Sequence, residues 1–174
     1  MVDIIKAAFP SCEQNNCMVV TTGQEVKITD VADSHCAIVE NGTDIFVISN
    51  PTQKNIHILY IDKCIFGKGQ QHKRCDCAAF DDKKFCFIEF KKTTPEREEN
   101  REDYISSATD QLYVTHEKFK EKGIDFKNYT LESWVSFADD PPVPAASTGF
   151  QNHELKFWVL YKSFFYTGNL IVFE

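Results

Sequence analysis

Three charged side chains whose types could act on a phosphate ester lie close together in otherwise apolar sequence. Asp76 interrupts the run RCDCAAF, and Glu89 and Lys91 lie in the run FCFIEFKK. Both runs are rich in Phe, Cys, Ile and Ala, and the polar residues 81–84 separate them. The segment 74–92 is therefore predicted to form a β-hairpin. Side chains alternate between the two faces of a strand, so Glu89 and Lys91 are expected on the same face.

The register of this hairpin places the two acidic side chains opposite each other. Whether the loop has two residues or four, the numbers of paired residues sum to 165, and Asp76 then faces Glu89. Facing residues have β-carbons roughly 5 Å apart, and like charges so placed destabilise a sheet. A divalent cation would remove this repulsion, because Mg²⁺ takes oxygen ligands and is commonly held by one or two carboxylates. Lys91 would reach the same place. The alternative is an ordinary solvated face of an antiparallel sheet.

This arrangement resembles the signature of the PD-(D/E)XK phosphodiesterase superfamily, which has the restriction-endonuclease-like fold. The signature consists of an Asp on one strand and an acid-x-Lys triplet on the next, antiparallel strand. Asp76, Glu89 and Lys91 match it, with Cys75 in place of the proline. The resemblance covers roughly residues 56–137. It implies that the two acids bind Mg²⁺ (or Mn²⁺) and that the lysine orients or activates the attacking water.

The resemblance also implies further site residues. The main-chain carbonyl after the first acid of the triplet, here that of Phe90, is often a metal ligand in the superfamily. A third acid often comes from an earlier element, and Asp62 is our choice, although the β-rich sequence before Asp76 departs from the usual arrangement. Gln111 lies on the helix expected after the triplet, where some members have a glutamine that lines the site. Thr115 occupies the tyrosine position of the Gln-x-x-x-Tyr motif of one branch, so a surface glutamine is the alternative for Gln111.

Basic residues gather around the motif in an otherwise acidic chain. The net charge is −7, which argues against broad electrostatic adhesion to nucleic acid. Between residues 62 and 92, however, eight basic residues stand against five acidic ones, which suits contact with a phosphate backbone. The expected nucleic-acid contacts are Lys68, Lys73, Arg74 and Lys92. Ordinary scatter of lysines in a hairpin is the alternative.

Length and composition indicate one folded domain over residues 1–174. Of these residues 43% are hydrophobic and 13% aromatic, which suits a globular chain with a buried core. No window approaches the ~18 apolar residues of a membrane span. The opening segment is too short and wrongly charged for a signal peptide, so no membrane association is expected.

The seven cysteines are an odd number, so a complete disulfide framework is excluded and a cytoplasmic, reducing location is expected. Zinc binding is the rival interpretation. The only close pairs are Cys75-x-Cys77 and Cys12-x4-Cys17, and neither belongs to a paired Cys-x-x-Cys arrangement. Small buried thiols are the better account of these residues.

The sequence before the hairpin is predicted to be rich in strands. Val2–Phe9 is expected to form a short helix. Strand-like runs separated by turn residues follow at 17–20, 25–29, 36–39, 44–48 and 56–61. Asn41-Gly42 is the sharpest hairpin signal in the chain. Residues 17–66 are therefore expected to form an antiparallel β-meander within a β-rich N-terminal part, 1–66.

After the hairpin the pattern becomes helical. Thr94-Pro95-Glu96 is typical of a helix start, and Gly123 is the expected stop. A strand at 129–137 would return beside the hairpin and make the sheet mixed. The C-terminal part, 138–174, is expected to hold a proline-rich connector, a buried helix at 155–165 and a short strand at 170–173. The predicted fold class is α/β (α+β), with a restriction-endonuclease-like mixed sheet flanked by helices and its core at 67–137.

These observations predict a metal-dependent nuclease that hydrolyses phosphodiester bonds, with DNA preferred over RNA as its substrate. The alternative from another class is a non-catalytic module that keeps the nuclease-like fold and acts through a protein partner or as a homodimer. The acidic balance and the absent Gln-x-x-x-Tyr motif favour the module, whereas the complete Asp, Glu and Lys set favours the enzyme.

Overall fold

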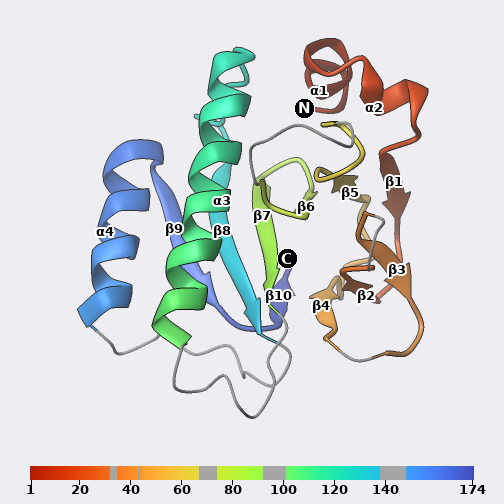
Figure 1. Cartoon of the computed structure of the whole chain (residues 1–174). Coiled ribbons are helices and arrows are strands. Elements are labelled where there is room, and N and C mark those ends of the chain that lie inside the picture. The colour runs from red at the N-terminus through yellow and green to blue at the C-terminus, as the bar shows by residue number, and fades with distance from the viewer. Residues whose placement is uncertain (32–34, 43, 67–73, 92–100, 138–147) are drawn as a thin grey trace.

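A computed structural model describes residues 1–31, 35–42, 44–66, 74–91, 101–137 and 148–174 (Figure 1). Within these residues the helices are α1 (Val2–Ala8), α2 (Ser11–Gln14), α3 (Arg101–Glu121) and α4 (Thr148–Tyr161). The strands are β1 (Met18–Thr21), β2 (Glu25–Thr29), β3 (Ala37–Val39), β4 (Phe46–Ser49), β5 (Ile56–Tyr60), β6 (Cys77–Phe80), β7 (Lys84–Lys91), β8 (Thr130–Phe137), β9 (Ser163–Thr167) and β10 (Leu170–Val172). The chain is thus mixed α/β, consistent with the predicted α+β class.

The larger sheet contains the predicted hairpin at its centre. Its strand order is β1-β5-β6-β7-β8-β9. Strands β6 and β7 are antiparallel, and Cys77 pairs with Ile88 and Phe80 with Phe85, which is the register that the sequence predicts. Strand β8 runs parallel to β7 after the intervening helix α3, so the sheet is mixed, as expected. Strand β9 is parallel to β8 and forms the last strand on that side.

Helix α3 ends where the glycine signal places its stop. Gly123 has a φ of +76°, the left-handed conformation that glycine adopts readily. Its N–H donates to the carbonyl of Lys120, and the N–H of Ile124 donates to that of Phe119, which satisfies carbonyl groups of the last turn. The predicted start at Thr94-Pro95 lies outside the described residues.

The prediction of a single N-terminal meander is wrong, because its strands are divided between two sheets. The order of the second sheet is β10-β4-β2-β3, while β1 pairs with β5 in the larger sheet. Strand β4 pairs with β2 rather than with β3, so Asn41-Gly42 lies between two strands that do not pair with each other. Burial explains this order, because Phe46 and Ile48 of β4 are fully buried whereas Ile38 of β3 is exposed. Strand β4, with two fully buried side chains, lies inside the sheet, and the short strand β3 lies at its edge.

Packing on both faces buries the larger sheet. Helices α3 and α4 cover one face of β7, β8 and β9 (Figure 1), and the rings of Phe85 and Phe87 contact Phe119 of α3. On the other face, Phe46 of the second sheet meets the rings of Phe90 and Trp134 edge-on. Burial on both faces explains why the β7 sequence is an almost continuous apolar run.

The C-terminal segment differs from its prediction. A helix is present, but it ends at Tyr161, and the chain turns at Lys162 (φ +55°) directly into β9. The prediction of a buried helix is wrong, because Leu155, Trp158 and Val159 are exposed. The predicted final strand is present as β10. Among the described residues, no helix is both long and apolar enough to cross a membrane.

One pair of cysteines is bonded. Cys17, directly before β1, forms a disulfide with Cys64, which follows β5. The other five cysteines are buried free thiols. Because Cys17 is bonded to Cys64, it is not available to form a zinc site with Cys12. Disulfides are rare in reducing compartments, so this pair gives the expected cytoplasmic location no support.

Candidate active site

The three motif residues lie at one end of the central hairpin. Glu89 and Lys91 are near the carboxyl end of β7, and Asp76 directly precedes β6. Phe87, on the same face of β7 as these two residues, packs against α3. The site therefore lies between the hairpin and α3, near the carboxyl end of a strand that is followed by a helix, where α/β sheets commonly bind ligands.

The hairpin backbone holds the first carboxylate in place. An Asp76 carboxylate oxygen, Oδ2, accepts a hydrogen bond from the main-chain N–H of Phe90 at 2.8 Å. Glu89 is only 2% exposed, and Asp76 is half-buried. Burial raises the pKa of Asp76 to about 6. Burial first, and the charge of Asp76 second, raise the pKa of Glu89 well above its usual range. The two acids therefore meet in a setting that penalises two negative charges.

Lys91 and Gln111 form a polar network with Glu89. The Lys91 ammonium lies 2.6 Å from Glu89 Oε1 and donates to Gln111 Oε1 at 2.8 Å. The Gln111 amide in turn donates to the carbonyl of Arg74 at 3.0 Å. The structure thus brings Gln111 into the site, where the resemblance implies it. The Thr115 hydroxyl accepts the N–H of Cys75, so α3 holds both polar groups of the peptide bond between Arg74 and Cys75.

The other residues implied as metal ligands are placed differently. Phe90 uses its N–H for Asp76, and its ring packs against Phe46. Asp62 donates its main-chain N–H to the carbonyl of Asp76, while its carboxylate acts on the guanidinium of Arg74 and raises that pKa against the lowering by burial. The charge of Asp30, which follows β2, also contributes to the raised pKa of Asp76 after burial. Only tertiary packing brings Asp30 here, because β2 belongs to the other sheet.

Of the four predicted nucleic-acid contacts, the structure describes only Arg74. Arg74 is 3% exposed, and its guanidinium lies over the ring of Phe66 at 4.5 Å. Such burial leaves little of Arg74 to offer to a phosphate, so its position gives the expected nucleic-acid contact no support. Lys68, Lys73 and Lys92 lie outside the described residues.

Asp76 and Glu89 offer oxygen ligands of the kind that a hard divalent cation prefers, but the described residues supply no third acidic ligand. Glu89 Oε2 is buried and has no donor among the described groups, but the Asp76 carboxyl lies within hydrogen-bonding range of Glu89 and, after burial, helps to raise its pKa, so the two acids can share one proton when no cation is bound. Two carboxylates that face each other around this oxygen suit Mg²⁺ or Mn²⁺, which keep several water ligands. In the described ranges, however, no group of three His, Cys, Asp or Glu side chains could hold a metal ion.

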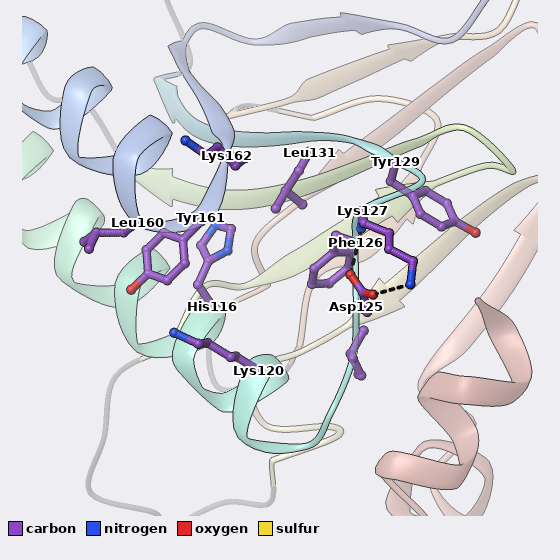
Figure 2. A pocket seen from close by; sticks show the side chains of 11 residues that line it. His116, Lys120, Asp125, Phe126, Lys127, Tyr129, Leu131, Leu160, Tyr161 and Lys162 are labelled. Atoms are coloured by element: carbon purple, nitrogen blue, oxygen red, sulfur yellow. Dashed lines mark hydrogen bonds and ion pairs between the residues drawn. The ribbon is translucent and has the colours of Figure 1, made fainter.

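A cavity of about 450 Å³ opens at the other end of the parallel strands (Figure 2). It is lined by residues around the end of α3, the start of β8 and the end of α4, among them His116, Leu131 and Tyr161. The buried His116 contacts Ser133 at 2.8 Å, and Ser133 contacts Ser163 at 2.9 Å.

No pattern along the chain predicts that His116 and Ser133 meet, because only the packing of α3 against β8 brings them together. Burial lowers the pKa of His116 to about 3. The imidazole is therefore neutral near pH 7 within its hydrogen-bond chain to Ser133 and Ser163.

Comparisons with protein-family models, curated proteins and solved structures find no match for this chain.

Proposed function

We propose that this chain is a metal-dependent phosphodiester hydrolase of the PD-(D/E)XK type that acts on DNA. One observation carries the proposal. Asp76 and Glu89 face each other at the end of the β6–β7 hairpin, and the ammonium group of Lys91 lies 2.6 Å from Glu89. This proximity supports the proposal, because the PD-(D/E)XK chemistry uses these three side chains together.

The residues of the chain would divide the work as follows. Asp76, Glu89 and the carbonyl of Phe90 would hold Mg²⁺ or Mn²⁺, and Asp62 is retained as the proposed third acid. The bound ion would supply an activated water and stabilise charge on the phosphate in the transition state. The Phe90 N–H fixes the carboxylate of Asp76. Gln111 holds the ammonium of Lys91, which would orient the water or offset developing charge.

The proposed DNA contacts are confined to the basic segment around the motif. A net charge of −7 opposes adhesion elsewhere on the surface, so the lysines at 68, 73 and 92 would guide the phosphate backbone to the hairpin. A cytoplasmic location belongs to the same proposal, since its substrate would be found there.

The decisive experiment is a cleavage assay with a matched buried glutamate as control. Plasmid, linear duplex and single-stranded DNA are incubated with Mn²⁺, with Mg²⁺ and with EDTA. We expect cleavage with either metal and none in EDTA. We also expect a loss of about a hundredfold or more in Glu89→Gln and Lys91→Ala, because each removes a charged group that acts on the transition state.

Glu132→Gln is the control. Glu132 is a buried glutamate of the same sheet and is paired with Lys84 at 3.3 Å, but it lies outside the motif. It should keep its activity if it stays folded by circular dichroism. Cleavage that survives in both Glu89→Gln and Lys91→Ala, or equal losses in folded Glu132→Gln, would refute the assignment.

A non-catalytic module that acts through a protein partner is the second candidate, and one observation favours it. Lys91 is already satisfied by Glu89 and Gln111, and the described residues give no third ligand to the acids. Calorimetric titration with Mn²⁺ separates the two candidates. The enzyme should bind Mn²⁺ and lose that binding in Glu89→Gln, whereas a module with a purely structural ion pair should show no Mn²⁺ binding.

A further inference from the structure

Exposed apolar side chains are concentrated on one edge of the molecule. Ten large hydrophobic side chains are exposed among the described residues, and five of them lie within the ten residues 155–164. These five are Leu155, Trp158, Val159, Leu160 and Phe164. A cluster of this kind marks an interaction surface more often than scattered single residues do.

Four of the five, Leu155, Trp158, Val159 and Phe164, are here called the edge patch, because helical spacing puts the first three on one side of α4, whereas Leu160 lines the cavity beside α3. Phe157 points from α4 into the core, where its ring stacks on that of Phe165 with centroids 4.9 Å apart. The patch residues of α4 lie on the opposite, exposed side of the helix. Trp158 reaches Phe164 of β9 with ring centroids 5.2 Å apart, and the ammonium of Lys162 lies over the Trp158 ring. The patch therefore joins the open face of α4 to the neighbouring strand.

The strand under the patch is also an unprotected sheet edge. In the described part of the chain no strand lies beyond β9. Its sequence SFFYT contains no proline, no lysine and no glycine, so it lacks the usual devices that keep an edge from pairing with another chain. The apolar helix face and the bare strand edge point to burial by the same partner.

We propose that the edge patch is the interface of a homodimer, with a second copy of this chain as its occupant. Self-complementarity favours a second copy, because a two-fold interface brings the same patch together with itself. The exposed Glu154 and Lys162 lie four residues before and four residues after Trp158. If α4 packs antiparallel to its symmetry mate across an axis near Trp158, Glu154 of each copy meets Lys162 of the other. Two apolar helix faces then close with two opposite-charge pairs at their rim.

Sedimentation equilibrium on the whole chain from about 1 to 100 µM tests the inference. The wild-type mass should rise from 20.0 kDa to twice that value. The pair Leu155→Glu and Val159→Glu, at positions 62% and 60% exposed, should remain monomeric at every concentration. Ile4→Glu with Val20→Glu is the matched control, since these positions are 51% and 58% exposed but lie outside the patch. That control should dimerise like the wild type.

A charge exchange then distinguishes a second copy from any other occupant. Glu154→Lys and Lys162→Glu should each weaken dimerisation about three- to tenfold, since exposed ion pairs contribute modestly. The two substitutions in one chain restore opposite charges across the axis and should recover the wild-type dissociation constant. A wild type that stays at 20.0 kDa up to 100 µM, or a Leu155/Val159 variant that dimerises as the wild type does, overturns the inference. So does a double exchange that is weaker than both single exchanges.

Discussion

Glu89 and Glu132 show how the same side chain can be buried in one sheet with different consequences. Glu132 accepts the indole N–H of Trp134 at 2.8 Å and is paired with Lys84, so both of its oxygens have partners. Glu89 is paired with Lys91 through Oε1, whereas its other carboxyl oxygen has no cationic partner among the described residues and, after burial, the nearby Asp76 carboxyl helps to raise its pKa. A buried carboxylate without full compensation costs stability, and this cost is the reason to look for a ligand at Glu89 rather than at Glu132.

Asp76 should make the metal-free protein less stable as the pH rises. Its pKa is about 6 in the folded chain against an ordinary value of 3.8. Between these values the folded state holds a proton that the unfolded chain has released, so the free energy of unfolding falls as the pH rises through this window. Urea unfolding from pH 4 to 7 in EDTA should show a fall of about 2 kcal/mol or more from Asp76 and Glu89 together, and Asp76→Asn should reduce it, because the charge of Asp76 also raises the pKa of Glu89.

The comparison must be made between variants at each pH. Burial lowers the pKa of His116 to about 3, and the resulting pH dependence of stability has the opposite sign. The unfolded chain takes up a proton on this histidine at a higher pH than the folded chain does, so the free energy of unfolding decreases as the pH falls. This contribution cancels in the difference between wild type and Asp76→Asn. A difference that is constant from pH 4 to 7 would contradict the raised pKa of Asp76.

The end of α3 gives a prediction about the backbone alone. At Gly123 an added β-carbon would meet no atom within 4 Å, so a substitution there costs only the left-handed conformation at φ +76°. Gly123→Ala should lower the free energy of unfolding by about 1 kcal/mol, and Gly123→Asn by less, because asparagine tolerates this conformation better. Urea denaturation measures both, and an unchanged Gly123→Ala would refute the prediction.

The β1–β5 pair is closed by a covalent bond. Cys17 and Cys64 are 47 residues apart in sequence, so their disulfide restricts a long loop in the unfolded chain. Cys17→Ser with Cys64→Ser should lower the free energy of unfolding by about 2 to 4 kcal/mol. Dithiothreitol should destabilise the wild type by the same amount and leave the double variant unchanged. A wild type with equal stability with and without reductant would argue against the bond.

Contact between the two sheets should make the whole molecule unfold as one unit. Phe46 is fully buried and touches Phe90 and Trp134 of the larger sheet. Phe46→Ala should cost about 3 to 5 kcal/mol, because it leaves a cavity between the layers. Ile38→Ala at an exposed site of β3 is the control, with an expected change within about 0.5 kcal/mol.

Urea transitions followed by tryptophan fluorescence and by far-ultraviolet circular dichroism should coincide in the wild type. Two separate transitions would show that the sheets fold independently.

The sequence alone determined the parts of this protein that depend on neighbours along the chain. Alternation and turn residues located most of the strands, the glycine located the end of α3, and the tetrad at 81–84 fixed a register in which Asp76 faces Glu89. Hairpin geometry leaves few alternatives, so a local pattern is enough there. The inclusion of Gln111 followed from the resemblance and from its place on the next helix.

Only the tertiary structure decided which strands share a sheet and which apolar faces are covered. Strand β1 pairs with β5 and not with β2, the next strand in the sequence. The C-terminal strand β10 pairs with β4, which lies in the N-terminal half of the chain. Asp30 approaches Asp76, and His116 meets Ser133, only through packing between elements. The apolar sequence of α4 predicted burial on all sides, but the chain covers only one side. The hydrophobic effect is non-directional, so burial against any apolar surface is favourable. The spacing of apolar residues along the chain can therefore predict that one face of an element is buried, but it cannot identify the element that packs against it.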